Sequence, residues 1–259
     1  MIKLAVKNFL KLFLSQKQRK TLRNIQHSIN ESLLNKNDLS EIGLFYGTDK
    51  IGSHYYTQHY MTYLQKIRKK HIRLLEIGVG GYDNPNFGGH SLRMWKKYFS
   101  HGQIYGLDIY DKSALQEKRI TIFKGSQIDN DFLEDVIKRT GELDIIIDDG
   151  SHLNEHIIET FKILFPKLKQ GGIYVVEDIQ TSYWPDMGGD SQNLLNQNTA
   201  MNFFKGLTDG LNYEEYLIPG YEPSYYDENI SDIHFYHNMV FVSKNKNNEG
   251  SNMVRNGKI

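Results

Sequence analysis

The chain has 259 residues, in which 31 lysines and arginines balance 31 aspartates and glutamates. This balance gives no overall basic field of the kind that concentrates nucleic acid, so we expect no nucleic-acid partner. The absence of cysteine excludes disulfides, thiolate metal sites and cysteine nucleophiles, and it fits a reducing, cytoplasmic compartment. No apolar stretch reaches the roughly 18 residues of a membrane span, so we expect a soluble or peripheral protein.

The N-terminal segment is basic and amphipathic. Apolar residues at positions 2, 6, 9, 10, 13 and 14 fall at helical spacing, which predicts a helix. Two interpretations stay open: peripheral docking at the inner face of a membrane, and packing against the protein or a second copy in a homo-oligomer. The basic residues that precede the first acid, Glu31, are Lys3, Lys7, Lys11, Lys17, Arg19, Lys20 and Arg23.

Strand-like and helix-like segments alternate in the main part of the chain. This rhythm is typical of an α/β protein with a doubly wound, Rossmann-like parallel sheet covered by helices on both faces. Two late runs, 232–236 and 239–243, are joined too tightly for a crossover helix and predict an antiparallel hairpin. The other predicted strands are 72–77, 103–108, 120–124, 143–148 and 172–177, and the predicted helices are 91–99, 132–140 and 154–169.

These patterns divide the chain into three parts. Residues 1–69 form an N-terminal helical extension, with the basic helix and a helical segment before the sheet. Residues 70–244 form the main domain, and the Gly-, Asn- and aromatic-rich stretch 183–230, with a helix near 199–207, is expected to act as a lid. Residues 245–259 are rich in Asn, Lys and Gly and are expected to be disordered.

Two predicted strands end in paired acids. The run IIIDDGSH (145–152) delivers Asp148 and Asp149, and the run VVEDIQ (175–180) delivers Glu177 and Asp178. Because the carboxyl ends of parallel strands share one edge of a sheet, these acids should meet near His152. The alternative is that they only cap the following helices.

A glycine-rich turn ends the first predicted strand. In LLEIGVGG (74–81), Gly78 and Gly80 can let the backbone pass close to a ligand, or can serve only a tight turn. Asp108 ends the next strand, where an acid can accept hydrogen bonds from the ribose of a nucleoside cofactor, or can cap a helix. The gap between Gly78 and Asp108 exceeds the roughly 20 residues of a dinucleotide fingerprint, which disfavours a plain NAD site.

Together these motifs resemble the class I S-adenosylmethionine-dependent methyltransferases. Within them, the chain is most similar to the metal-dependent sugar O-methyltransferases of macrolide biosynthesis, the mycinamicin 2''-O-methyltransferase type. The similarity covers most of 46–241, and its long strings are far more specific than the glycine turn. The shared strings are YGTDKIGSHYYTQHY (46–60), LLEIGVGGY (74–82), GGHSLRMWKKYF (88–99), IYGLDIYDKS (104–113), IIIDDGSHLNEH (145–156), GGIYVVEDIQTSYW (171–184) and HFYHNMVF (234–241).

The resemblance implies a seven-stranded sheet, S-adenosyl-L-methionine as cofactor and a sugar hydroxyl as methyl acceptor. Position by position, it implies that Asp149, Glu177 and Asp178 bind Mg2+ or Mn2+ and that His152 is the general base. Oxygen ligands are those that Mg2+ prefers, and a neutral histidine with a pKa of about 6.5 can take a proton near neutral pH. The residues that it implies for the cofactor are Glu76, Gly78, Gly80, Asp108, Gln127, Asp148 and Tyr56. It also implies that the run 52–60 folds over the cofactor; the alternative is that its aromatic residues only pack a helix onto the sheet.

The acceptor and the oligomeric state stay open, because the first 45 residues and 185–230 depart from the family pattern. The acceptor sugar belongs to a surface glycan or to a glycosylated natural product. Three alternatives remain: a metal-dependent methyltransferase of a catechol-like molecule, a nucleotide-sugar or NAD-binding oxidoreductase, and a non-catalytic glycan-binding scaffold.

Overall fold

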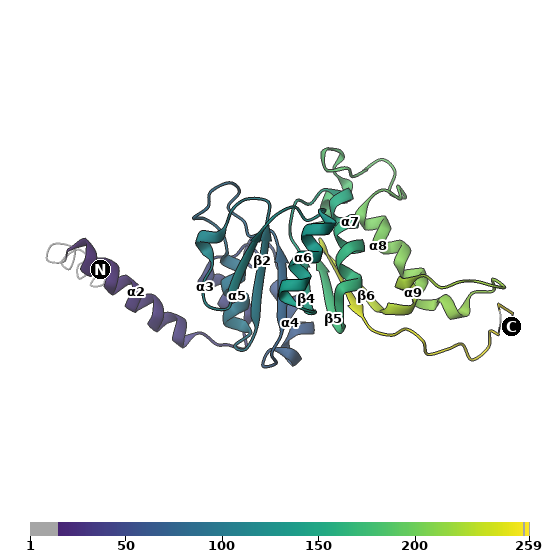
Figure 1. Ribbon diagram of the computed structural model, residues 1–259, viewed down its shortest axis with the longest axis horizontal. Helices are drawn as coiled ribbons and strands as arrows, with labels where there is room; N and C mark the ends of the chain where they lie inside the picture. Colours follow the sequence, from purple (N-terminus) through teal and green to yellow (C-terminus); the bar gives the residue numbers. More distant parts are fainter. Residues whose placement is uncertain (1–14, 256, 259) are drawn as a thin grey trace.

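The computed structural model describes residues 15–255 together with 257 and 258, so the helix expected over 2–14 lies outside the described residues. The centre of the molecule is a seven-stranded sheet in the order β3-β2-β1-β4-β5-β7-β6 (Figure 1). The first five strands of this order pair in parallel, and β7 and β6 run antiparallel at its end. The strands are β1 Arg73–Ile77, β2 Gln103–Asp108, β3 Ile120–Lys124, β4 Leu143–Asp148, β5 Leu168–Val176, β6 Ile230–Tyr236 and β7 Met239–Lys244.

The predicted doubly wound sheet with a C-terminal hairpin is confirmed. The strand order reverses beside β1, which pairs with β2 on one side and with β4 on the other. In open α/β sheets, ligands bind outside the carboxyl ends of the strands at such a switch point. The sheet therefore places the glycine turn that follows β1 next to the acids that follow β4.

Helices cover both faces of the sheet. Ile146 points into the core formed with α6, α7 and α8, whereas Ile145 and Ile147 point into the core formed with α3, α4 and α5. This alternation follows from the pleat, and burial on both faces explains why the strands read as continuous apolar runs. The helices are α3 Leu39–Tyr46, α4 Thr57–Leu64, α5 His90–Tyr98, α6 Asn130–Thr140, α7 Asn154–Leu164 and α8 Ala200–Asp209.

One helix ends earlier than predicted. The sequence predicted a helix over 154–169, but α7 ends at Leu164, a short 3-10 turn spans Phe165–Lys167, and β5 begins at Leu168. Pro166 explains the difference, because proline lacks the backbone N–H that a continued helix needs and its ring clashes with the carbonyl one turn earlier.

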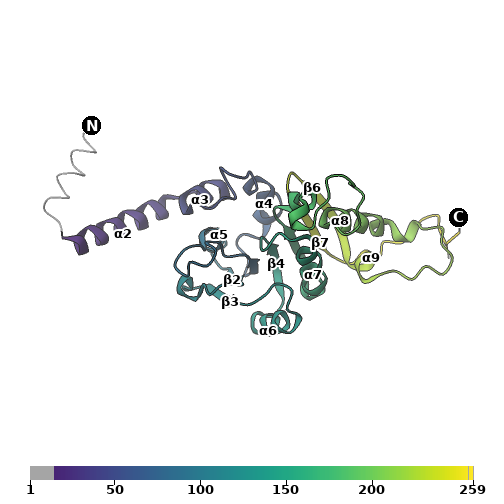
Figure 2. The same ribbon diagram turned by 90° about the horizontal axis from the view of Figure 1, so that it is seen from above.

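A long helix that the sequence did not predict precedes the sheet. α2 spans Gln16–Leu33 and begins with a capping box, in which the Ser15 side chain and Gln18 cap each other's backbone. It contacts the body near its C-terminal end, where the Tyr46 hydroxyl donates to Glu31 at 2.7 Å. The rest of α2 projects away from the sheet in both views (Figures 1 and 2).

The segment after β5 is only partly open. α8 buries Ala200 and Phe204 in the core, and α9 (Tyr225–Asn229) follows it, so the most exposed parts of the expected lid are the stretches 183–198 and 217–225. In the segment expected to be disordered, the Asn247 side chain donates to three backbone carbonyls, including that of Asp227. None of the described helices is long and apolar enough to cross a membrane.

Candidate active site

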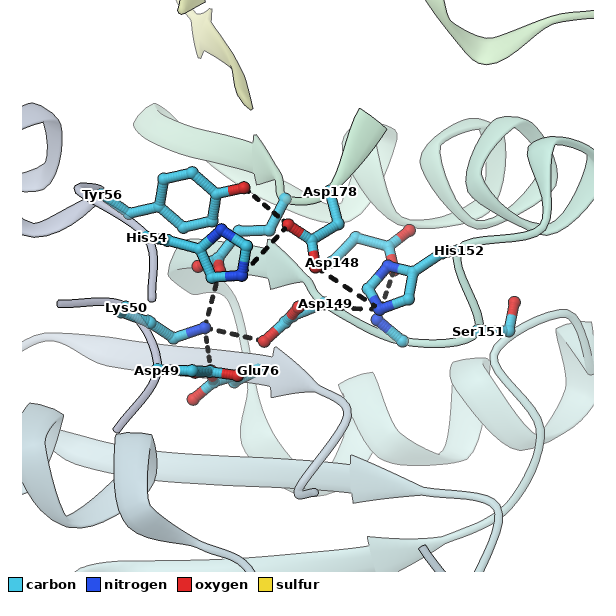
Figure 3. Close-up of polar contacts among 12 residues, drawn as sticks. Asp49, Lys50, His54, Tyr56, Glu76, Asp148, Asp149, Ser151, His152 and Asp178 are labelled. Atoms are coloured by element: carbon cyan, nitrogen blue, oxygen red, sulfur yellow. Dashed lines mark hydrogen bonds and ion pairs between the residues drawn. The ribbon is translucent and has the colours of Figure 1, made fainter. Parts of the chain in front are cut away.

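The backbone brings the ends of β1, β4 and β5 together at one edge of the sheet (Figure 3). The amide of Asp149 donates to the carbonyl of Ile77 at 3.0 Å, and the amide of Glu177 donates to the carbonyl of Asp148 at 2.9 Å. These bonds continue the parallel pairing one residue beyond the strands. The acids that follow β4 and β5 therefore leave the sheet at the same edge, as the sequence predicted.

Gly78 allows the close approach between the turn after β1 and the turn after β4. Its φ is +90°, and a Cβ atom at this position would lie 2.0 Å from the carbonyl oxygen of Asp149. Gly80 has a similar φ of +78°, but a Cβ atom there would meet nothing within 4 Å. Glycine is thus required at position 78 for two reasons: the left-handed backbone conformation and the close contact with the Asp149 carbonyl.

This contrast gives a matched pair of substitutions. Gly80→Ala should lower the free energy of unfolding by roughly 1 kcal/mol, because only the left-handed backbone is strained. Gly78→Ala should lower it by roughly 3 kcal/mol, because the alanine also displaces the Asp149 carbonyl. Urea unfolding of the ligand-free protein measures both, and equal losses would show that the contact with Asp149 is unimportant.

Asp149, His152 and Asp178 form a cluster that could hold a metal ion. One ligand atom from each lies within 4.8 Å of the other two. His152 Nε2 is 3.9 Å from Asp149 Oδ1 and 4.0 Å from Asp178 Oδ2, and the three side chains point toward one another (Figure 3). Their side chains are 20–27% exposed, so the cluster is open to solvent.

The backbone under this cluster is strained at two positions. His152 has a φ of 57° and Asp178 has a φ of 54°, the left-handed region that side-chain-bearing residues seldom adopt. Each costs on the order of 1–3 kcal/mol and persists only where the surrounding structure enforces it. Such positions concentrate at functional sites, which supports a chemical role for both residues.

A buried lysine that the sequence did not predict lies at the base of the cluster. Lys50 comes from the loop between α3 and α4, and its side chain is 1% exposed. Its Nζ lies 2.7 Å from Asp149 Oδ2, 2.8 Å from Glu177 Oε2 and 3.0 Å from Glu76 Oε1. Burial opposes the charged form of Lys50, but its three carboxylate neighbours outweigh burial and raise its pKa well above the ordinary value.

Glu177 is turned into the protein rather than toward the cluster. Its Oε2 faces Lys50, and its Oε1 accepts a short hydrogen bond from the hydroxyl of Tyr60. Burial raises the pKa of Glu177 well above its usual range, and the neighbouring carboxylates of Asp149 and Glu76 raise it further against the opposing effect of Lys50. Of the three predicted metal ligands, the structure brings Asp149 and Asp178 together and places Glu177 on Lys50 and Tyr60.

Two aromatic residues hold Asp178 from the other side. The Tyr56 hydroxyl donates to Asp178 Oδ1 at 2.5 Å, and His54 Nε2 lies 4.0 Å from the same oxygen. The rings of His54 and Tyr56 stack with centroids 4.6 Å apart. Burial raises the pKa of Tyr56, and its hydrogen bond to Asp178 raises it further. These contacts leave Asp178 Oδ2 facing His152.

Asp148 and Gln127 form a buried pair beside the site. Gln127 Nε2 donates to Asp148 at 3.1 Å and to the Thr160 hydroxyl at 3.0 Å, and Gln127 Oε1 accepts from the amide of Ser151. Burial raises the pKa of Asp148 to about 7. The pair supports the turn that carries His152, and its predicted contact with a cofactor stays a prediction.

The remaining predicted cofactor residues surround the turn after β1. Glu76 is fully buried, with its second oxygen accepting from Trp95 Nε1 at 3.0 Å. Asp108 accepts from the amides of Val79 and Tyr110, both at 2.9 Å, which fixes its carboxylate beside the glycine turn. The space next to Gly80 is open. A glycine turn with an acid fixed beside it fits a nucleoside cofactor.

The donor set also fits a hard divalent cation. Among the described residues, the nearest polar partner of Asp149 Oδ1 and of Asp178 Oδ2 is His152, at 3.9 and 4.0 Å, and the chain offers no thiolate. Mg2+ is bound in proteins by one or two carboxylates together with water or substrate oxygens, which is what this cluster supplies.

Three residues of the site were missed by the sequence reasoning: Lys50, Tyr60 and His54. All three lie in the shared string YGTDKIGSHYYTQHY (46–60), of which only the run 52–60 was interpreted as a segment that folds over the cofactor. The signal was the density of titratable and aromatic side chains in that string. The burial of a lysine against three distant acids is not visible in a sequence pattern.

No family model matches the chain. Over 217 residues it is 46% identical to mycinamicin VI 2''-O-methyltransferase of Micromonospora griseorubida, which covers 83% of this chain and 54% of that enzyme. It is also 46% identical over 219 residues to demethylmacrocin O-methyltransferase of Streptomyces fradiae, covering 83% and 55%. The chain is a homologue of the macrolide sugar O-methyltransferases. The predicted resemblance is confirmed, and the chain spans about half the length of the curated relatives it matches.

Solved structures agree with this relationship. The MycE methyltransferase of the mycinamycin biosynthetic pathway, in complex with Mg and SAH, superposes with a TM-score of 0.80 at 46% identity, covering 82% of this chain and 56% of that one. A complex of the same enzyme with Mg, SAH and mycinamycin VI gives a TM-score of 0.79 at 47% identity, covering 82% and 55%. This homologue of the sugar O-methyltransferases therefore has the class I methyltransferase fold.

Proposed function

We propose that the chain is an S-adenosylmethionine-dependent, divalent-metal-dependent O-methyltransferase that acts on a sugar hydroxyl of a surface glycan or glycosylated natural product. The observation that carries the proposal is the cluster of Asp149, His152 and Asp178 at the switch point of the sheet, beside the glycine turn. The names of its homologues, which describe O-methyltransferases of mycinamicin and of rhamnosyl tetracenomycin, support the same reaction and acceptor class.

S-adenosylmethionine supplies a methyl group on a sulfonium, which is electrophilic enough for transfer to oxygen. Its proposed place is along the glycine turn, with Asp108 toward its ribose hydroxyls. Gly80 leaves open space there, and the Asp108 carboxylate is held rigidly by two backbone amides. These residues bind and orient the cofactor and take no part in moving the proton.

Asp149 and Asp178 are the proposed metal ligands, with Glu177 behind them. A divalent cation bound there supplies a Lewis acid that holds sugar oxygens and stabilises negative charge developing on them. Lys50 and Tyr56 fix the outer oxygens of the two aspartates, so that the inner oxygens face His152. His152 Nε2 then accepts the proton of the acceptor hydroxyl as general base.

We further propose that the enzyme acts in the cytoplasm, at the inner face of the membrane. A chain without cysteine fits a reducing compartment. The basic N-terminal segment would be attracted to the anionic lipids of that face.

The proposed reaction is tested by binding first and by turnover second. Isothermal titration should detect S-adenosylhomocysteine and no NAD. Incubation with labelled S-adenosylmethionine and a panel of rhamnosides should transfer label only when Mg2+ or Mn2+ is present. Binding of NAD would overturn the methyltransferase assignment, and turnover of a catechol without any turnover of sugars would overturn the acceptor class.

A further inference from the structure

The helix α2 exposes an apolar stripe that no described residue covers. None of its eighteen residues is buried. Leu22, Ile25, Ile29 and Leu33 are spaced by three, four and four residues, which places them along one side of a helix. Their side chains are 46%, 50%, 49% and 76% exposed.

The contacts between α2 and the body come from the opposite side of the helix. The ring of His27 lies 4.7 Å from that of Phe45, and Glu31 accepts from Tyr46. At about 100° per residue, His27 and Glu31 lie more than a quarter turn from the stripe. The stripe therefore faces outward. Helices in proteins gain most of their stability by packing their apolar side, and the apolar side of α2 has no such contact with the described residues.

The charges of α2 select the kind of partner. Lys17, Lys20 and Arg23 lie in its N-terminal half, and no acid precedes Glu31 in the chain. Glu31 is itself occupied, because it accepts from the Tyr46 hydroxyl and pairs with Lys97 at 3.5 Å. A second α2 would thus bring cations near cations and offer no available carboxylate, whereas an anionic surface is complementary to it.

The position of α2 suits a flat partner. It projects beyond the sheet in both perpendicular views, so its stripe can reach a surface without obstruction by the body (Figures 1 and 2). The fifteen residues before it add Lys3, Lys7 and Lys11 and no acid. Positive charge therefore continues in the sequence on the N-terminal side of α2.

We propose that α2 is a docking element for a membrane surface rich in anionic lipid. The apolar stripe lies in the headgroup region, and Lys17, Lys20 and Arg23 form the basic polar face of the helix, the arrangement of interfacial amphipathic helices. This inference deepens the proposed location and is independent of the chemistry, so an inactive Asp149→Asn variant should bind lipid as the wild type does.

The test is co-flotation of the full chain with vesicles of phosphatidylcholine alone or with about 30% phosphatidylglycerol. The wild type should float only with the anionic vesicles, and roughly 0.5 M salt should release it. Ile25→Ser with Ile29→Ser should weaken binding by about tenfold or more. Lys17→Gln with Lys20→Gln and Arg23→Gln should weaken it on the order of a hundredfold.

A matched control distinguishes binding through the α2 stripe from nonspecific binding through other exposed apolar residues. Leu217 and Ile218 are 56% and 54% exposed elsewhere on the molecule, so Leu217→Ser with Ile218→Ser should leave flotation unchanged. Equal binding to both kinds of vesicle, or no effect of the α2 substitutions, would overturn the proposal. Concentration-dependent self-association that Ile25→Ser with Ile29→Ser abolishes, without flotation, would show that a second copy is the partner.

Discussion

Asp149→Asn should reduce the affinity of the protein for Mn2+ or Mg2+ by at least about a hundredfold. Replacing a residue that only orients a metal ligand already lowers metal affinity by about 10–100-fold. Asp149 is proposed to bind the ion directly, so its replacement should lower the affinity more. Its Oδ1 also faces His152, so methyl transfer should fall in parallel. Titration calorimetry measures the affinity, and transfer of label from S-adenosylmethionine measures the activity.

The strand that precedes Asp149 provides the control for Asp149→Asn. Asp144 lies near the other end of β4, its side chain is equally 21% exposed, and it pairs with Lys169 at 3.2 Å. Asp144→Asn should leave metal affinity and activity unchanged. His152→Ala should abolish turnover but keep most of the metal affinity, whereas a loss as large as that of Asp149→Asn would make His152 a ligand instead of the base.

Lys50→Met should be the most destabilising single substitution of the site, by about 3–5 kcal/mol. It leaves Glu76 and Glu177, which are 0% and 2% exposed, without their shared cation. Urea unfolding of the metal-free protein measures the loss. Adding Glu177→Gln should recover part of it, because one uncompensated buried charge is then removed.

Lys244→Met is the matched control for the lysine. Lys244 is also buried, but its Nζ donates to the backbone carbonyls of Phe165, Pro166 and Leu168 and meets no carboxylate. Lys244→Met should therefore lower the free energy of unfolding, and adding Glu177→Gln should recover none of that loss. If Glu177→Gln rescued both lysine variants equally, or neither, the ion pair between Lys50 and Glu177 would have no special importance.

Much of the fold could be predicted from the sequence because both faces of the sheet are buried. Strands such as Ile145–Ile147 then read as uninterrupted apolar runs, and their chain order gives parallel pairing. The parallel pairing also predicted the sheet edge at which Asp149 and Asp178 meet. The helix α2 was missed although Leu22, Ile25, Ile29 and Leu33 fall at helical spacing, because these four are its only apolar residues and polar residues dominate the segment.

The rest of the site depends on contacts between distant residues. Lys50 lies 99 residues from Asp149 and 127 residues from Glu177, and no local pattern reports such partners. Glu177 and Asp178 are neighbours in sequence, yet the left-handed backbone at Asp178 sends one carboxylate into the interior and the other toward His152. Sequence reasoning had assigned both to the metal.

The reach of Lys50 also bears on the order in which the molecule assembles. Its loop is synthesised before β1, but two of its three carboxylate partners, Asp149 and Glu177, follow β4 and β5, so the loop can complete its contacts only after most of the sheet has formed. Closing such long loops is slow, and it makes this contact a late event in folding. A chain that lacks the residues before β1 would bury Glu76 and Glu177 without the Lys50 ammonium that neutralises them. We therefore expect residues 46–60 and the sheet to fold as one cooperative unit.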